Sequence, residues 1–257
     1  MEKRYSGIRY GEKPKNDNIV FGFHPVKEAL IAKKAIDKIL LQKTSSNDLS
    51  FIIQECKEME IPFQFVPIEK LNRITAKNHQ GVIAFVSPVH FSKIENIIPE
   101  VYEKGEVPLV VILDRVTDVR NFGAICRSAE CAGAHAVIIP EKGAAQVNED
   151  ALKTSAGALM HLPICKEYNL KNTIQFLKDS GLKIVSCTEK TDKSLFEENL
   201  NEPLCIIMGS EEEGISAEYL KLSDKKVKIP MFGKIGSLNV SVATSVILYE
   251  CVRQRKF

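Results

Sequence analysis

Long apolar runs are missing from this 257-residue chain. No stretch approaches the roughly 20 consecutive apolar residues that a membrane-spanning helix needs, and the chain opens on charged residues, not on a secretory signal. We therefore expect a cytoplasmic protein. With 44% hydrophobic and 26% charged residues the composition is that of a globular protein, long enough for one large domain or two smaller ones.

Cysteine pairs at metal-ligand spacing are missing as well. The 7 cysteines are an odd number, C-x-x-C does not occur, and no histidine stands at zinc-ligand spacing. This argues against the usual zinc sites and against a disulfide framework. The sequence favours reduced thiols, most of them buried, and no metal.

The chain has little excess charge of either sign, because 35 Lys and Arg stand against 33 Asp and Glu, for a net charge of +2. Composition alone therefore does not indicate a nucleic-acid-binding protein. Basic residues do gather within residues 3–15 and at the C-terminus, at Arg253, Arg255 and Lys256. These ends could contact phosphates, but solubilising charge on a mobile end explains them at least as well.

Several ligand-binding motifs are absent. The first strand of the larger expected sheet is not followed by G-x-G-x-x-G, and neither G-x-x-x-x-G-K-[ST] nor G-x-S-x-G occurs. These absences argue against a dinucleotide-binding enzyme, a P-loop enzyme and an α/β-hydrolase.

What the chain does contain is two blocks in which helix and strand patterns alternate. Residues 18–87 predict a small α/β domain, and residues 107–257 a larger one whose mostly parallel sheet is covered by helices on both faces. Residues 1–17 show no hydrophobic period and predict a flexible arm. Residues 88–106, with a weak helical pattern around prolines and a glycine, are the expected linker.

Apolar runs and helical periods predict the individual elements. The first block predicts helices near 25–31, 47–59 and 68–76 and strands at 38–42, 63–66 and 81–87. The second block predicts strands at 107–114, 136–139, 159–164, 182–188, 204–208 and 226–230 and helices at 121–133, 148–155, 169–180, 216–222 and 238–253.

Three loops of the second block follow strands, and ligands bind at the carboxyl ends of parallel strands. They comprise residues 114–129, 208–214 and 229–243. The third sets three polar side chains beside two glycines, and glycine lets a backbone approach a ligand closely.

Each loop also has an ordinary structural interpretation. Asn121 suits a helix N-cap, Arg127 a surface ion pair, and residues 209–214 a plain acidic turn. Ser237 could cap the last helix, with Asn239 in its first turn. Taken singly these alternatives stay open, but three polar, glycine-containing loops at one sheet edge favour a ligand site.

Longer patterns in the same loops carry a family resemblance. N-x-G-A-x-x-R is met from Asn121 to Arg127, G-x-E-x-x-G at 209–214, and I-P-M-x-G-x-x-x-S-L-N-V-S-V-A at 229–243. In this order and separation they resemble the SpoU (TrmH-like) family of the SPOUT methyltransferases. The third pattern is too long to match by chance. One departure is Val119, where the family usually has proline.

The first block extends the resemblance to residues 18–255. Residues 22–30 and 78–84 are similar to the L30e-like RNA-binding domain of bacterial 23S rRNA guanosine 2′-O-methyltransferases. The resemblance implies methyl transfer from S-adenosylmethionine to a ribose 2′-hydroxyl of RNA, most of all a guanosine of large-subunit rRNA. It also implies a trefoil knot in the catalytic domain and a homodimer formed through that domain.

The resemblance assigns two groups of residues to the active site. The implied catalytic residues are Asn121, Arg127, Glu211, Ser237 and Asn239. The implied cofactor-binding residues are Gly209, Ile229 and Leu238, through their backbones, and Thr188 near the rim.

Arg127 is the residue we expect to matter most. Methyl transfer needs the 2′-hydroxyl in line and its proton removed. In the family an arginine is proposed as the base, but a guanidinium stays protonated in proteins. We therefore expect Arg127 chiefly to orient the target phosphate and stabilise the developing alkoxide, with Glu211 holding Arg127 or the loop. Ser237 and Asn239 are expected to organise substrate and cofactor.

In the first block, His24, His79 and Gln80 are the expected RNA contacts. For each histidine the alternative is a structural side chain with satisfied hydrogen bonds. A ribose in an RNA loop is recognised by shape and single-stranded access, which suits a net charge of only +2.

Three other functions remain open from sequence. The first is the same chemistry on transfer RNA, and the second is a catalytically silent RNA-binding or ribosome-assembly protein on the same scaffold. The third, a different cofactor-using α/β enzyme, leaves the pattern at 229–243 unexplained.

Overall fold

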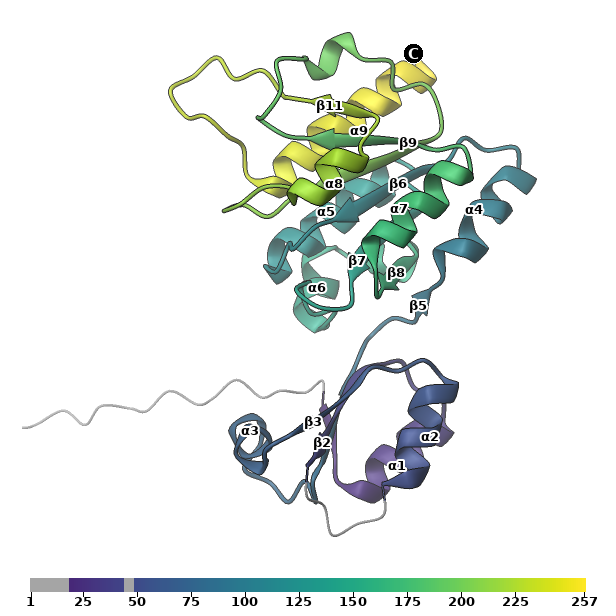
Figure 1. Cartoon of the computed structure of the whole chain (residues 1–257), viewed down its shortest axis with the longest axis vertical. Coiled ribbons are helices and arrows are strands. Elements are labelled where there is room, and N and C mark those ends of the chain that lie inside the picture. The colour runs from purple at the N-terminus through teal and green to yellow at the C-terminus, as the bar shows by residue number, and fades with distance from the viewer. Residues whose placement is uncertain (1–18, 44–48) are drawn as a thin grey trace, which may run out of the picture. The chain divides into compact units, whose positions relative to one another are not determined.

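The computed structural model describes residues 19–43 and 49–257, in which the chain forms two compact units that divide between Val86 and Ser87. Figure 1 shows the elements of both units, which are described separately below. The predicted arm at 1–17 lies outside the described residues. Within those residues, no helix is long and apolar enough to cross a membrane.

The first unit is a four-stranded mixed sheet with helices on both faces. Its elements are β1 (Ile19–Phe21), α1 (Phe23–Ile31), β2 (Ile36–Gln42), α2 (Ser50–Glu58), β3 (Phe63–Val66), α3 (Ile68–Ile74) and β4 (Val82–Val86). The strand order is β1-β4-β2-β3; β4 is antiparallel to β1 and β2, and β2 is parallel to β3. The predicted small α/β domain therefore gains a short edge strand at 19–21.

Alternation along these strands decides which helix covers which face. Successive side chains of a strand point to opposite faces. Ile39, Leu41 and Val82 pack with α1 and α2, whereas Leu40 and Ile83 pack with α3. Because α3 has only seven residues, it covers one part of its face and leaves another part partly exposed.

The second unit alternates strands and helices along most of its length. Its elements are β5 (Phe91–Ser92), α4 (Ile94–Glu103), β6 (Leu109–Leu113), α5 (Val119–Cys131), β7 (Ala136–Pro140), α6 (Glu149–Thr154), η1 (Ala158–Met160), β8 (Ile164–Glu167), α7 (Leu170–Asp179), β9 (Lys183–Cys187), η2 (Leu195–Glu197), β10 (Leu204–Met208), α8 (Ala217–Leu222), β11 (Lys225–Val227) and α9 (Val240–Lys256).

Its seven strands form one sheet in the order β11-β9-β10-β6-β7-β8-β5, and every pair is parallel. The central strands β6 and β10 are buried at every residue. Such continuous apolar runs are typical of strands covered on both faces. The predicted parallel sheet is thus confirmed.

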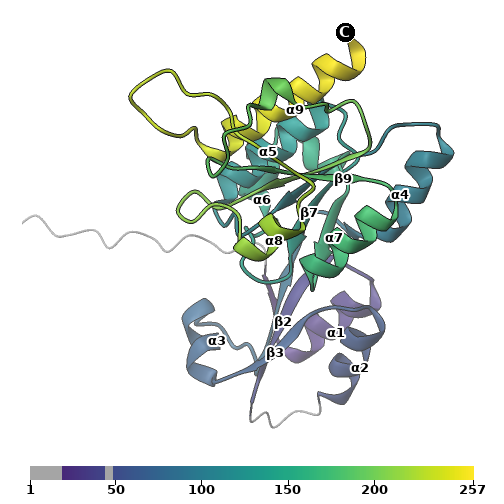
Figure 2. The same cartoon turned by 45° about the horizontal axis from the view of Figure 1, so that its top comes forward.

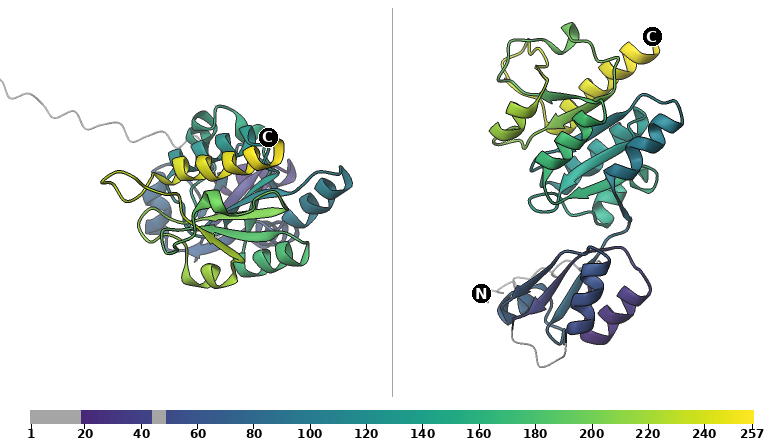
Figure 3. Two further views of the ribbon diagram at one scale, coloured as in Figure 1. Left: turned by 90° about the horizontal axis from the view of Figure 1, so that it is seen from above. Right: turned by 45° about the vertical axis from the view of Figure 1, so that its right-hand side comes forward.

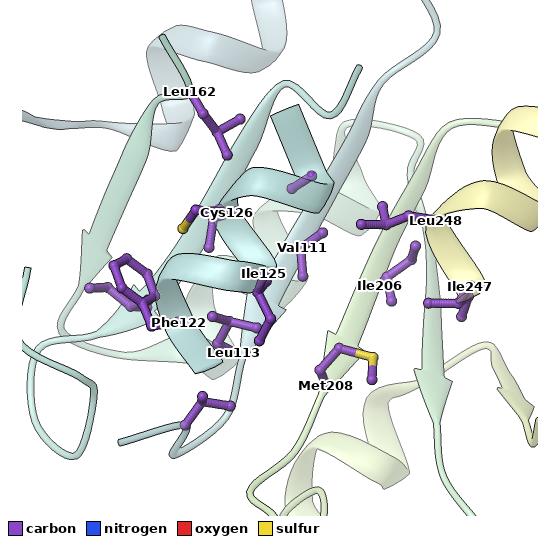
Figure 4. Packing of buried hydrophobic residues seen from close by; sticks show 14 of the residues in the cluster. Val111, Leu113, Phe122, Ile125, Cys126, Leu162, Ile206, Met208, Ile247 and Leu248 are labelled. Carbon is purple, nitrogen blue, oxygen red and sulfur yellow. The ribbon is translucent and has the colours of Figure 1, made fainter. Parts of the chain in front are cut away.

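Helices cover the two faces of this sheet. One core joins α5, α6 and α9 to the sheet, and Figure 4 shows Ile125 of α5 beside Leu113 and Ile247 of α9 beside Ile206. The other core joins α4 and α7, with α8 at its edge. Figure 3 (left) shows α9, in yellow, on the opposite side of the green strands from α7 and α8, and Figure 2 shows the same layers obliquely.

Two stretches differ from the sequence-based expectation. Residues 88–106, expected as a linker, contain β5 and α4, and both elements belong to the second unit. Ile94, Ile98 and Val101 are buried against that sheet, so tertiary packing stabilises a helix whose sequence period is weak. The strand predicted at 159–164 is wrong in position, because η1 occupies its first residues and β8 begins only after Pro163.

The basic C-terminus is part of the fold. Arg255 donates hydrogen bonds to the backbone carbonyls of Val107, Pro108, Leu200 and Glu202, and this burial lowers its pKa. Arg253 pairs with Glu250 at 2.7 Å. The interpretation of these residues as a mobile, solubilising end is therefore wrong for Arg255.

The seven cysteines are free thiols, as expected. Five are buried, and burial raises the pKa of Cys56 to about 11 and that of Cys251 to about 12. Cys131, at the end of α5, is exposed.

A glycine makes the contact between α5 and α6 possible. A Cβ at Gly123 would lie 2.8 Å from the Thr154 Cβ and 2.9 Å from the Ala151 carbonyl oxygen. The two helices can approach this closely only without a side chain there.

We expect Gly123→Ala to lower the free energy of unfolding by about 1–3 kcal/mol, because the added methyl group forces α5 and α6 apart. Urea titration followed by circular dichroism measures this. Cys131→Ala, an exposed substitution in the same helix, is the matched control and should unfold like wild type. Equal stability of the two variants would contradict the packing argument.

Candidate active site

The three polar loops meet at one edge of the seven-stranded sheet. Strands β6, β9, β10 and β11 are neighbours and parallel, so their carboxyl ends lie together. The loops that follow these strands carry the residues assigned to the site. Because the strands are parallel, loops that are far apart in sequence lie close together at this edge.

Glu211 connects all three loops. Its Oε1 accepts a hydrogen bond of 3.0 Å from Asn121 Nδ2 and one of 2.6 Å from Asn239 Nδ2. Asn239 Nδ2 also donates to Asn121 Oδ1 at 3.1 Å. One carboxylate thus holds an amide from each of the other two loops.

This carboxylate lies where two helices begin. Asp118 caps α5, accepting from the backbone N–H of Asn121 at 2.8 Å, and Asn239 caps α9, accepting from the backbone N–H of Ser241 at 3.0 Å. The sequence had left open that Asn121 and Ser237 are the N-caps of these helices, and this interpretation is wrong for both. Glu211 thus lies beside the first residues of both α5 and α9.

A buried acid holds the Glu211 loop in place. Asp114, 2% exposed, directly follows β6, and its Oδ2 accepts from the backbone N–H of Ser216 at 2.6 Å and from the Ser216 hydroxyl at 2.7 Å. Arg115 donates to Asp114, to Glu213 and to the carbonyl of Gly214. The hydrogen bond to Asp114 is the main cause that raises the pKa of Arg115.

Gly209 lets the same loop fold back on itself. A Cβ at this position would collide with the backbone of Gly214 and Ile215. Close approach of two backbone segments therefore requires glycine here, as expected for a loop that offers its backbone to a ligand.

Beside this cluster lies a cavity of about 1020 Å³. It is lined by residues 187–190 after β9, 208–214 after β10, 228–231 after β11, and 236–240 with Ala243 at the start of α9. All four predicted cofactor-binding residues contribute: Thr188, Gly209, Ile229 and Leu238. So do Glu211, Ser237 and Asn239 of the predicted catalytic set.

Arg127 stands apart from this arrangement. It is exposed on α5, does not line the cavity, and makes no hydrogen bond or ion pair with any residue that the structure describes. Glu211 was expected to hold either Arg127 or the loop. Its hydrogen bonds go to Asn121 and Asn239, so they support the second role and not the first. Ser237 is likewise exposed.

The three expected RNA contacts of the first unit have different surroundings. His79 is buried; its Nδ1 accepts from the backbone N–H of Gly81 at 3.1 Å and its Nε2 lies 2.9 Å from Asn72 Oδ1. Both ring nitrogens are thus used inside the domain, as the structural alternative expects. Gln80 and His24 are exposed, and the Gln80 side chain accepts from the backbone N–H of Phe23 at the start of α1.

Sequence analysis did not identify the supporting residues Asp114, Arg115 and Asp118. A signal for Asp114 was present, because it ends a continuous apolar run just before the N-x-G-A loop. Nothing in the sequence indicates that Ser216, 102 positions away, completes its hydrogen bonds.

Comparison with known proteins matches both units. A family model described as the SpoU rRNA Methylase family covers residues 108–249, which is more than half of the chain. A second, described as RNA 2'-O ribose methyltransferase substrate binding, covers residues 19–92. The chain belongs to the SpoU methylase family.

Individual members of the SpoU family are similar along most of the chain. The 23S rRNA (guanosine-2'-O-)-methyltransferase RlmB of Photobacterium profundum is 37% identical over 244 residues, which are 94% of this chain and 99% of the relative. The SpoU methyltransferase AviRb of Streptomyces viridochromogenes, solved with AdoMet, is 26% identical with a TM-score of 0.59, and covers 92% of this chain and 90% of its own.

A tRNA-modifying enzyme is also similar. The TrmH/SpoU enzyme of A. aeolicus is 30% identical with a TM-score of 0.53, and the match covers 63% of this chain and 84% of that enzyme. The SpoU fold therefore includes members named for each of the two RNA classes.

Replacing Asp114 should disorder the Glu211 loop. We expect Asp114→Ala to lower the free energy of unfolding by about 2–4 kcal/mol, because it leaves the backbone N–H of Ser216 without its acceptor and removes one of the three partners of the Arg115 guanidinium. Binding of S-adenosylmethionine, measured by calorimetry, should weaken as well.

Ser216→Ala is the matched control for that variant. It removes only the hydroxyl hydrogen bond and should lower the free energy of unfolding by about 1 kcal/mol. If Asp114→Ala binds the cofactor as wild type does, the network does not position the loop.

Proposed function

We propose that this SpoU-family chain transfers a methyl group from S-adenosylmethionine to a ribose 2′-hydroxyl of RNA, on a guanosine of large-subunit rRNA. The observation that carries the proposal is the joining of three loops by Glu211 beside a cavity. Similarity to RlmB along nearly the whole chain supports the choice of substrate. Ribosomal RNA as substrate also supports a cytoplasmic location.

The cavity suits the cofactor in size and chemistry. Its volume, about 1020 Å³, is at the upper end of the range for sites that enclose small molecules. Backbone groups at Gly209, Ile229 and Leu238 would hold the cofactor, with Thr188 beside them. The carboxylates of Glu211 and Glu212 on the lining favour a ligand with positive charge. Bound there, S-adenosylmethionine supplies an electrophilic methyl group on a positively charged sulfur.

The chain's own residues orient the reacting groups and stabilise the charge that develops on the substrate oxygen. Glu211 keeps Asn121 and Asn239 in fixed orientation, so that the polar groups around the reacting oxygen need not reorganise during the reaction. Ser237, at the mouth of the cavity, helps to orient the substrate. Arg127, unpaired among the described residues and exposed, is available to bind the phosphate next to the target ribose and to stabilise the developing alkoxide.

The first test is transfer from labelled S-adenosylmethionine to unmodified large-subunit rRNA, with transfer RNA alongside. Digestion and mass spectrometry should locate a 2′-O-methylguanosine in the rRNA. Label in transfer RNA alone would overturn the substrate assignment and keep the chemistry. Cofactor binding without transfer to rRNA, to transfer RNA or to ribosomal precursor particles would favour the silent RNA-binding scaffold.

Within the same assay, Arg127→Ala should lower kcat on the order of 100-fold with cofactor affinity unchanged, because a charge that stabilises the transition state is lost. Arg120→Ala, another exposed arginine of α5, is the matched control and should keep wild-type kcat. Equal activity of both variants would remove Arg127 from the proposed site.

We also propose that the second unit forms a homodimer. Val242 and Tyr249, two turns apart on α9, are 47% and 51% exposed, and Phe232 and Ile235 in the segment before α9 are exposed too. Val242 and Tyr249 share one face of α9, and exposed apolar side chains that share a face favour burial against a partner. The family resemblance also implies a dimer through this domain, whereas the implied knot stays a prediction.

The Val242→Asp/Tyr249→Asp double variant should sediment as a monomer at micromolar concentration, where wild type sediments as a dimer, because the two charges would be buried without partners. Tyr168→Asp is the control, since Tyr168 is 82% exposed and lies just before α7, outside α9. A monomeric wild type, or a double variant that still dimerises, would contradict the proposed interface.

A further inference from the structure

The sheet face of the first unit that α3 partly covers also carries two phenylalanine rings. Phe21 of β1 pairs with Ile83 of β4, and Phe85 lies two residues after Ile83 in β4. Side chains two positions apart on a strand share a face, so Phe21 and Phe85 are diagonal neighbours about 7–8 Å apart. Both are partly exposed and border the small core under α3.

Each ring has a lysine ammonium above it. Lys38 Nζ lies 4.8 Å from the ring centre of Phe85, its direct cross-strand partner, and Lys77 Nζ lies 5.6 Å from that of Phe21. Among the described residues, neither ammonium takes part in a salt bridge. We call Phe21, Phe85, Lys38 and Lys77 together the aromatic face.

The charges next to the aromatic face are mostly positive. The helix that packs on this side, α3, exposes Lys70 and Arg73 against a single acid, Glu69. The net charge of the whole chain is only +2, so this local excess of positive charge is not a property of the composition.

Aromatic rings beside lysines that form no salt bridge among the described residues match the chemistry of single-stranded nucleic acid. Bases stack on aromatic side chains whatever their sequence, and lysines bind the backbone phosphates between them. Two separate rings offer stacking positions for two bases. An acidic protein partner would use the lysines but would have no need for two partly exposed aromatic rings.

We propose that the aromatic face is a binding surface for single-stranded RNA, on which two unpaired bases of the substrate stack on Phe21 and Phe85. On binding, Lys38 and Lys77 move from the rings to the neighbouring phosphates. This surface differs from the His24 and Gln80 positions at the start of α1, and it rests on the proposed function only in taking the substrate to be RNA.

Two double variants separate stacking from charge. In Phe21→Leu/Phe85→Leu the apolar volume is largely kept and the flat rings are lost, so KM for RNA and the RNA dissociation constant should rise on the order of tenfold. Both kcat at saturating RNA and cofactor affinity should stay unchanged. Phe65→Leu is the matched control, because Phe65 is an exposed ring on the opposite face of the same sheet.

In Lys38→Gln/Lys77→Gln, RNA binding should weaken and depend less on salt, with the slope of log K against log salt reduced by about 1.4 for two lost phosphate contacts. Lys34→Gln/Lys57→Gln, two exposed lysines elsewhere in this unit, should leave the slope as in wild type.

Direct binding to an unmodified rRNA fragment, measured by fluorescence anisotropy on the full chain, keeps this test independent of catalysis. If wild type binds RNA without methylating it, the proposed function fails while the variants still test the aromatic face. Wild-type affinity in the phenylalanine variant would overturn the proposal. So would a variant whose melting temperature falls while RNA affinity is unchanged, because the face would then be packed within the protein.

Discussion

All seven strands of the larger sheet run in one direction, and the site depends on this constraint. A parallel sheet needs crossovers, so helices come to cover both faces and the strands are buried as continuous apolar runs. It also places every strand's carboxyl end at one edge. Residues as distant in sequence as Asn121 and Asn239 can therefore share the carboxylate of Glu211.

Two acids near that edge have different surroundings. Asp114 is buried and its acceptor capacity is taken up by Ser216 and Arg115, so it serves to hold the loop. Glu211 is exposed, lines the cavity, and accepts hydrogen bonds from Asn121 in α5 and from Asn239 at the start of α9. The buried acid thus holds the loop that carries the exposed acid.

The two units contribute different means of recognition. In the SpoU unit, a cavity and backbone groups at strand ends suit a small cofactor. In the first unit, the aromatic face presents partly exposed rings with ammonium groups above them, which suit the extended polymer that we propose as its ligand. A short α3 that leaves part of its sheet face uncovered is therefore consistent with binding and not only with packing.

The sequence by itself determined the fold class, the two-block organisation and the family, because apolar periods report burial directly and the pattern at 229–243 is contiguous. Through the family resemblance it also indicated Thr188, Gly209, Ile229 and Leu238, and all four line the cavity. Only the tertiary structure decided that residues 88–106 carry β5 and α4. It also decided that both ring nitrogens of His79 form hydrogen bonds, with Asn72 and Gly81. The physical reason is that such features depend on partners distant in sequence, and local periodicity contains no information about them.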